Sequence, residues 1–247
     1  ECFFARDRVG VRPLFYSIFS NTFVFGSEIK SIFEFPGIVR RFMPEALKEV
    51  FTFWTTLSPH TIFDGIYEIP PGHYALYKEG HIKVKRYWSL KFASNFSSGE
   101  ESFGEAIAHF KYLLSDSVSL RLRSDVQVGA FLSGGLDSSV ITSLIRRTNS
   151  GQLNTYSIRF DNDTYDESRY QNEVSQYFQT NHKSYLCSVS DIAEYFSEAV
   201  WHSETPLLRT APVPVMGLSK LVHENGIKVI MTGEGADEAF AGYNIFK

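Results

Sequence analysis

The strongest chemical signal in the sequence is a glycine-rich turn that carries one acid and several hydroxyls. The string SGGLDSS, residues 133–139, follows a short apolar run at 126–132 and precedes an apolar run at 140–147 that suits a helix. Two glycines at a strand-to-helix junction let backbone amides approach an anion, and the following helix directs its positive end to the same place. Further hydroxyl donors are expected from Ser133, Ser138 and Ser139. The turn is therefore typical of a phosphate cradle.

The acid in this turn indicates which kind of phosphate it would hold. The common phosphate loop, GxxxxGK[ST], brings a lysine to the β- and γ-phosphates, and the sequence contains no such string. Asp137 stands where that loop offers the lysine, and a carboxylate beside a polyphosphate requires a divalent cation between them. The turn predicts binding of metal-bound pyrophosphate, and hence ATP cut between its α- and β-phosphates. An ordinary glycine-rich strand-to-helix turn is the alternative interpretation of the string alone.

A second glycine-rich turn with acids follows another apolar run. Residues 226–231 read as a short buried strand, and the string TGEGADE at 232–238 ends that strand and starts a helix. Two such turns suit one crevice at the carboxyl ends of parallel strands. The acids of this second turn also suit a solvated helix N-terminus, where the helix dipole favours them.

The second turn offers groups that complement those of the first. We expect the backbone of Thr232 and Gly233 to lie along a nucleotide. Asp237 is expected to be a second metal ligand opposite Asp137, because divalent cations prefer carboxylate oxygens. Glu234 stands between two glycines, ahead of the helix proper, and is the candidate for moving protons.

Taken together, the two turns resemble the PP-loop ATP pyrophosphatase domain of glutamine-dependent asparagine synthetases, the asparagine synthase B family. Strings near the start of the chain resemble the last part of that family's glutaminase domain, at residues 5–16, 25–30 and 69–74. The resemblance covers nearly the whole chain. It implies that residues 1–92 are the C-terminal portion of a glutaminase domain, 93–102 a linker, and 103–247 the N-terminal portion of a PP-loop domain.

The periodicity of the sequence predicts an α/β fold. Short β runs alternate with turns up to about residue 90, with a helix at 44–51. An amphipathic helix is expected at 103–122, with a stripe that suits core packing at Phe103, Ile107, Phe110, Leu114 and Val118. Strands and helices then alternate over 126–132, 140–147, 153–160, 167–178, 183–187, 191–201, 212–225 and 227–231. Such alternation predicts a parallel sheet covered on both faces. The resemblance implies a Rossmann-like PP-loop domain, preceded by a mostly β remnant of an N-terminal-nucleophile αββα domain.

The resemblance also implies a two-step reaction. Attack of the aspartate side-chain carboxylate on the α-phosphorus of ATP would give β-aspartyl-AMP and pyrophosphate, and ammonia from glutamine would then displace AMP. Glu234 would take a proton from the attacking ammonia, and Asp137 and Asp237 would hold Mg²⁺. The implied ATP and pyrophosphate site comprises Leu132, Ser133, Gly134, Gly135, Leu136, Asp137, Ser138, Ser139, Ile158, Thr232 and Gly233. Within it, the resemblance implies that Ile158 and Leu132 pack against the adenine, and a plain core position is the alternative for both.

The glutaminase half-reaction is not expected from these residues. Family members carry an N-terminal cysteine whose amine and thiolate hydrolyse glutamine, but Cys2 follows Glu1 and lies in a string typical of a late strand. The family's glutamine-binding positions lie upstream of that string. The chain is therefore expected to be a fragment that begins inside its first domain and stops before a lysine thought to contact the ATP phosphates, so it is expected to be inactive or incomplete alone.

Composition excludes several classes of function. A net charge of −4 without a Lys/Arg run argues against nucleic acid as a partner, and no apolar stretch approaches the length of a membrane span. Two cysteines cannot build a disulfide framework or a zinc site. The expected setting is the cytoplasm, with ATP, aspartate and glutamine or ammonia as small-molecule partners and a homodimer for the intact protein.

Three interpretations remain open at this point. The first is an asparagine synthetase, and the second is another PP-loop adenylating enzyme that forms an amide or a lactam. The loop chemistry alone does not separate these two. The third is a non-catalytic, nucleotide-binding fragment, since a chain cut at both ends would expose apolar surface.

Overall fold

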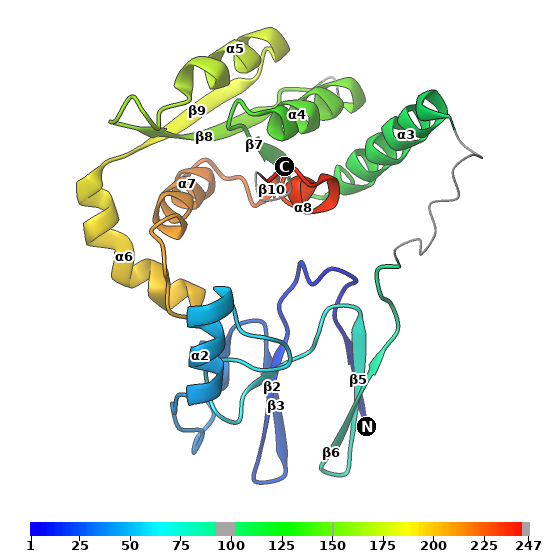
Figure 1. Ribbon diagram of the computed structural model, residues 1–247, viewed down its shortest axis with the longest axis vertical. Coiled ribbons are helices and arrows are strands. Elements are labelled where there is room, and N and C mark those ends of the chain that lie inside the picture. The colour runs from blue at the N-terminus through cyan, green and yellow to red at the C-terminus, as the bar shows by residue number, and fades with distance from the viewer. Residues whose placement is uncertain (92–101, 150, 244–247) are drawn as a thin grey trace. The chain divides into compact units, whose positions relative to one another are not determined.

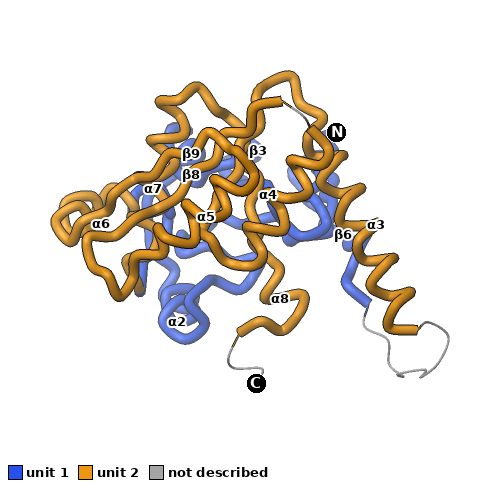
Figure 2. The backbone as a smooth tube through the Cα atoms, turned by 90° about the horizontal axis from the view of Figure 1, so that it is seen from above, with its two compact units in different colours: residues 1–96, 200–208 blue, residues 97–199, 209–247 orange. Residues whose placement is uncertain are grey.

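The computed structural model describes residues 1–91, 102–149 and 151–243, so the predicted linker lies outside the described residues apart from Ser102. The chain forms two compact units, coloured blue and orange in Figure 2. Unit 1 comprises residues 1–96 and 200–208, and unit 2 comprises residues 97–199 and 209–247.

Unit 1 is mostly β-sheet, as predicted. One antiparallel sheet has the order β1-β5-β6, made of β1 (Cys2–Ala5), β5 (His73–Lys78) and β6 (His81–Arg86). A second has the order β3-β2-β4, made of β3 (Thr22–Gly26), β2 (Phe15–Phe19) and β4 (Tyr67–Glu68). The helices are α1 (Ile29–Ile32) and α2 (Pro44–Phe53). Tyr16 of β2 and Ala75 of β5 share one buried cluster, so the two sheets bury their apolar faces together.

Residues 200–208 belong to unit 1 although they lie far along the chain. The carboxylate of Glu204 accepts hydrogen bonds from the backbone amides of Ile29 and Lys30, both at 2.6 Å. These amides open α1 and have no partner within that helix, so an acid is stabilising there. The Lys30 ammonium also lies 5.9 Å from the ring centroid of Trp201. The segment is thus held by charge and by backbone amides.

Unit 2 is built around a four-stranded parallel sheet, which confirms the predicted fold class. Its order is β10-β7-β8-β9, from β10 (Val229–Met231), β7 (Val128–Phe131), β8 (Asn154–Phe160) and β9 (Asn181–Cys187). The helices are α3 (Phe103–Arg121), α4 (Leu136–Thr148), α5 (Ser168–Phe178), α6 (Val189–Ser203), α7 (Pro212–Glu224) and α8 (Ala236–Phe240). In Figure 1, α4 and α5 lie on one side of this sheet and α7 on the other.

Both faces of the sheet carry a core. On one face, Ala130 of β7 packs with Ile145 of α4 and Val118 of α3. On the other face, Tyr156 of β8 packs with Leu218 of α7. Alternate side chains of a strand point to opposite faces, so a parallel sheet covered twice needs apolar residues at nearly every position. This requirement explains why β7 (VGAF) and β10 (VIM) read as continuous apolar runs, whereas β9 at the edge of the sheet carries exposed polar residues.

The predicted core stripe of α3 is wrong over its first half. Phe103, Ile107 and Phe110 are 83%, 37% and 42% exposed, and Val118 is the residue of this helix that is buried. Only the last turns of α3 reach the core of the sheet. The start of the helix is stabilised locally instead, because Ser102 and Glu105 form a reciprocal capping box.

The two cysteines lie in strands of different units. Cys2 lies in β1, as predicted, where its side chain is half-buried, and Cys187 is buried at the end of β9. Both are free thiols. No helix in the described part of the chain combines the length and apolar character that a membrane crossing demands.

Candidate active site

The first glycine-rich turn joins β7 to α4, as predicted. Leu132 is fully buried and its amide donates to the carbonyl of Tyr156, 2.8 Å away, which continues the pairing of β7 with β8 for one residue. Gly134 then reverses the chain with a φ of +84°, which L side chains rarely adopt. Helix α4 begins at Leu136, four residues earlier than the predicted start at 140, so Asp137 lies in its first turn. The unpaired amides of that turn face the end of the strand.

Hydroxyl groups hold this turn in shape. Ser138 is 8% exposed, and its Oγ donates to the carbonyl of Gly135 at 3.2 Å and accepts from the amide of Ser133 at 3.2 Å. The Ser139 hydroxyl donates to the same carbonyl at 2.7 Å. The Ser133 hydroxyl accepts from the amide of Gly135 at 3.2 Å. The three hydroxyls expected to face phosphate therefore bond within the turn, and the backbone amides of α4 remain as its donors.

The second turn joins β10 to α8 at the same edge of the sheet. Strand β10 pairs in parallel with β7, so both strands deliver their following turns to their carboxyl ends. A Cβ atom built on Gly233 would lie 2.9 Å from Cβ of Asp137 and 3.2 Å from the amide nitrogen of Ser138. Gly233 therefore packs directly on the first turn. This contact brings the two predicted turns into one site.

The second turn is strongly acidic. The phenol of Tyr243 donates to a carboxylate oxygen of Glu238 at 2.6 Å. This hydrogen bond, together with the negative charges of Asp237 and Glu234, raises the pKa of Tyr243 to about 12. The same bond lowers the pKa of Glu238 below its usual value. The negative charges of all three acids of the second turn therefore act on Tyr243.

The two residues predicted to contact the adenine, Leu132 and Ile158, differ in their exposure. The Leu132 side chain is completely buried, so it belongs to the core and is not available to a nucleotide in this structure. Ile158 is half-buried on β8 and packs against the cluster that contains Tyr156 and Leu218. Only Ile158 of this pair has exposed surface, and it lies one strand away from the first turn.

Helix α5, which the sequence predicted at 167–178, also lies against the first turn. A Cβ atom on Gly134 would lie 2.7 Å from Cβ of Tyr170 and 2.8 Å from the amide nitrogen of Gln171. The start of α5 therefore rests on the turn. The preceding loop is fixed by Asp166, which accepts from the amide of Phe160 at 3.2 Å, and the hydrogen bond from Ser168 lowers the pKa of that carboxyl. Gln171 had no signal of its own in the sequence, because a lone glutamine inside a helix is ordinary.

Metal ligation at this edge would rest on few protein groups. Among residues 1–91, 102–149 and 151–243 there is no group of three or more His, Cys, Asp or Glu side chains placed to hold a metal ion. Asp137 is exposed and Asp237 is partly exposed. Two accessible acids suit Mg²⁺, which commonly takes one or two carboxylates and completes its shell with phosphate oxygens and water.

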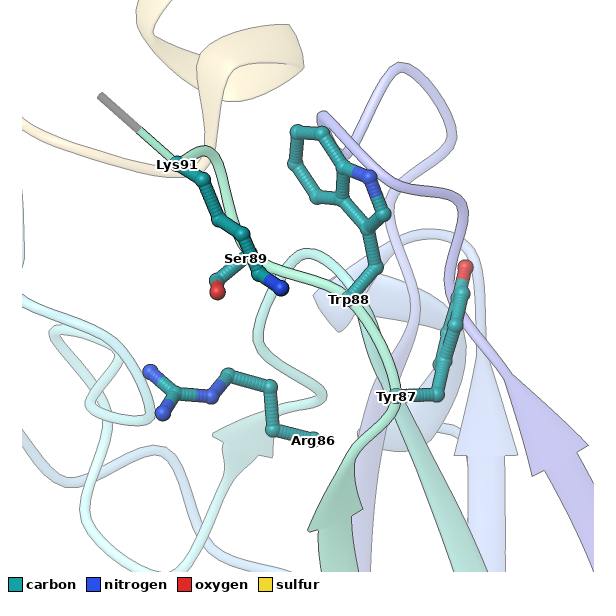
Figure 3. A pocket seen from close by; sticks show the side chains of 5 residues that line it. All are labelled: Arg86, Tyr87, Trp88, Ser89 and Lys91. Carbon is teal, nitrogen blue, oxygen red and sulfur yellow. The ribbon is translucent and has the colours of Figure 1, made fainter. Parts of the chain in front are cut away.

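A separate hollow lies in unit 1. It has a volume of about 510 Å³ and is lined by Arg86, Tyr87, Trp88, Ser89 and Lys91 (Figure 3). The Tyr87 hydroxyl donates to the carbonyl of Arg6 at 2.7 Å, which fixes this segment against the start of the chain. None of the predicted site residues lines this hollow, so it is not the nucleotide site inferred from the two turns.

Comparison with known families follows the same division. The family model described as asparagine synthase matches residues 109–247, and the model described as glutamine amidotransferase domain matches residues 1–88. The chain belongs to the asparagine synthase family. Its two glycine-rich turns both lie within the part that the first of these models covers.

Individual relatives are longer than this chain. Asparagine synthetase [glutamine-hydrolyzing] 3 of Bacillus subtilis is 34% identical, across 99% of this chain and 41% of its own length. Putative asparagine synthetase [glutamine-hydrolyzing] 2 of Methanocaldococcus jannaschii is 32% identical, across 98% of this chain and 47% of its own length. Amidase chyE of Penicillium rubens is 30% identical, across 98% and 38%. The chain thus spans less than half the length of these relatives.

Proposed function

We propose that this chain carries the adenylating site of an ATP-dependent, amide-forming ligase, and that its acyl substrate is aspartate. The observation that supports this most directly is the packing of Gly233 on Asp137 and Ser138. It brings the amides of α4 and the acids of the second turn to one edge of the sheet. Membership of the asparagine synthase family supports the choice of reaction class.

In the first step, the carboxylate oxygen of aspartate would attack the α-phosphorus of ATP, and the bond to the β-phosphate oxygen would break. Negative charge then develops on the departing pyrophosphate. Amides at the start of α4 are oriented before the reaction by the hydroxyl bonds of Ser138 and Ser139, so they would stabilise this charge without reorganising. Gly134 and Gly135 leave room for the phosphate to approach the backbone.

Mg²⁺ would supply charge neutralisation for the polyphosphate when bound. Asp137 and Asp237 are the residues that would hold it. The fit rests on their accessible carboxylates, because Mg²⁺ commonly takes one or two carboxylates together with phosphate oxygens and water.

In the second step, ammonia would attack the carbonyl carbon of the aspartyl adenylate, AMP would leave, and the nitrogen would lose a proton. Glu234 is exposed in the second turn and is the base that we assign to this proton. The match of residues 1–88 to a glutamine amidotransferase domain supports glutamine as the source of ammonia in the whole protein.

The test uses this chain with ATP, Mg²⁺, aspartate and ammonium, and measures pyrophosphate, AMP and asparagine. We expect isothermal titration to show that magnesium-ATP binds, and any pyrophosphate that is released to depend on aspartate. Absence of ATP binding would contradict the proposal. Asp125→Asn is the matched control for Asp137→Asn, because Asp125 precedes β7 outside the turn.

A second candidate differs only in the acid that is activated. The relative named amidase chyE covers this chain as fully as the synthetases do. The same assay with a panel of other carboxylic acids separates the two. Pyrophosphate release with another acid, and none with aspartate, would replace the substrate while keeping the adenylation.

A further inference from the structure

A network of hydrogen-bonded polar side chains is buried between α5, β8 and β9. Four of the eight buried polar residues of the described chain belong to it, namely Thr155, Ser157, Gln171 and Ser175. Burying hydroxyls and an amide is unfavourable unless each is hydrogen-bonded. Such a concentration beneath one helix therefore calls for a reason beyond packing.

Gln171 lies at the end of this network that is nearer the carboxyl ends of the strands. Its side chain is 3% exposed, and its Nε2 donates to the carbonyl of Ile158 at 2.9 Å. Its Oε1 accepts from the hydroxyl of Ser157 at 2.8 Å. The amide group thus ties α5 to β8 at the residue assigned to the adenine. The backbone nitrogen of the same Gln171 lies against Gly134.

The remaining contacts form one directed series. The Ser157 hydroxyl already donates its hydrogen to Gln171, so it accepts a hydrogen bond from Nε2 of His182, 3.1 Å away. A neutral imidazole then has Nδ1 as an acceptor, and Thr155 donates to it at 3.0 Å. The Thr155 hydroxyl lies 2.7 Å from that of Thr180, which lies 3.0 Å from that of Ser175. Burial lowers the pKa of His182, which agrees with a neutral ring.

We propose that Gln171, held in place by this series, is a positioning residue for the SGGLDSS turn. The turn itself has hydroxyls that fix its inner shape, but they bond only within it. The amide of Leu132 ties the start of the turn to β8, and Gly134 lies against the start of α5. The two hydrogen bonds of the Gln171 side-chain amide tie α5 to β8 at that point. Positional precision at a reacting phosphate depends on such supporting contacts.

The test compares two ends of the same series. Gln171→Met keeps the length of the side chain and removes both hydrogen bonds at the end near Gly134. Ser175→Ala removes one buried hydrogen bond at the other end of α5 and is the matched control. Three quantities are measured on the full chain: amide exchange of Gly134 and Gly135 by NMR, affinity for magnesium-ATP, and the thermal midpoint.

We expect Gln171→Met to speed exchange at Gly134 and Gly135 and to weaken ATP binding, each by about tenfold. Ser175→Ala should lower the thermal midpoint and leave both other quantities within about twofold. Equal effects of the two variants on exchange at the turn would overturn the proposal. If Gln171→Met fails to fold, Ser157→Ala removes a single hydroxyl from the same end and is held to the same comparison.

The ATP measurement rests on the proposed function, whereas the exchange measurement does not. Failure of the unmodified chain to bind ATP would contradict the adenylating role alone. Unchanged exchange at Gly134 in a folded Gln171→Met variant would contradict the positioning role alone.

Discussion

The two glycine-rich turns of unit 2 occupy neighbouring strands but are held in different ways. The first has buried Ser138 at its centre, internal hydroxyl bonds and a thirteen-residue helix behind it. The second leads into a helix of only five residues, and its acids are accessible. Its position comes from the pairing of β10 with β7 and from the contact of Gly233 with the first turn. The first turn is thus a preformed anion site, and the acidic second turn depends in part on contact with it for its position.

Gly134→Ala should have the largest effect, because it removes the support of the cradle. The new methyl group would meet Cβ of Tyr170 at 2.7 Å and backbone atoms of Gln171, at a φ of +84°. Backbone strain and overpacking together are expected to lower the free energy of unfolding by about 3 kcal/mol. Urea unfolding of both proteins measures this. A loss below that of Gly233→Ala would contradict the ranking of the turns.

Gly233→Ala tests the contact between the turns. The added methyl group would lie 2.9 Å from Cβ of Asp137, so the second turn must move away from the first. We expect a loss of about 2 kcal/mol in the free energy of unfolding, and a large loss of ATP affinity. Gly104→Ala in α3 is the control, because nothing lies within 4 Å of its new methyl group. It should stabilise the protein by about 0.5–1 kcal/mol.

Ser138→Ala probes the hydroxyl at the centre of the cradle. The variant leaves the amide of Ser133 and the carbonyl of Gly135 short of one partner each. We expect about 1–2 kcal/mol less stability and weaker pyrophosphate binding. Ser119→Ala is the control, since it also loses one bond from a hydroxyl to a helix carbonyl. Equal losses in both variants would show that the centre of the cradle has no special role.

The smallest effect on stability is expected from ionisation of Tyr243, beside the acids of the second turn, at high pH. Tyr243 has a pKa of about 12, above the ordinary value of 10, because Glu238, Asp237 and Glu234 disfavour its charged form. Its stabilising contribution is therefore complete below pH 10 and is lost as the pH rises through 12. The absorbance titration of the Tyr243→Phe variant, subtracted from that of the unmodified chain, should show one phenol with this pKa. Glu238→Gln should lower that pKa toward 10, and an unchanged value would contradict the assigned hydrogen bond.

The sequence was sufficient for the sheet and for the two turns. Apolar runs ending in glycines identified β7 and β10 and predicted that their two turns meet, because parallel strands deliver their turns to one edge. That Asp137 and Asp237 share a metal ion stays a prediction. Hydroxyl types at Ser138 and Ser139 were read correctly as part of the turn. Their partners were not, because a sequence does not say whether a hydroxyl bonds to its own loop or to a ligand.

Two features were beyond the sequence for a different reason. Gln171 and His182 act through partners on other strands, and the contact of Gln171 with Ile158 depends on the exact rotation of α5. The stripe on α3 failed because helical periodicity gives a face without saying what covers it. Phe103 therefore looked like a core residue and is 83% exposed.

The central claim is that the two turns bind one magnesium pyrophosphate together. Calorimetric titration of that ligand into the unmodified chain, Asp137→Asn, Asp237→Asn and the double variant tests it most directly. We predict that each single variant weakens binding by at least about tenfold. The double variant should bind more weakly than either single variant, but its loss of affinity should be smaller than the product of the two single losses, because both acids act on one ligand. Binding by Asp237→Asn that equals the unmodified chain, alongside a loss in Asp137→Asn, would show that the second turn is no part of the site.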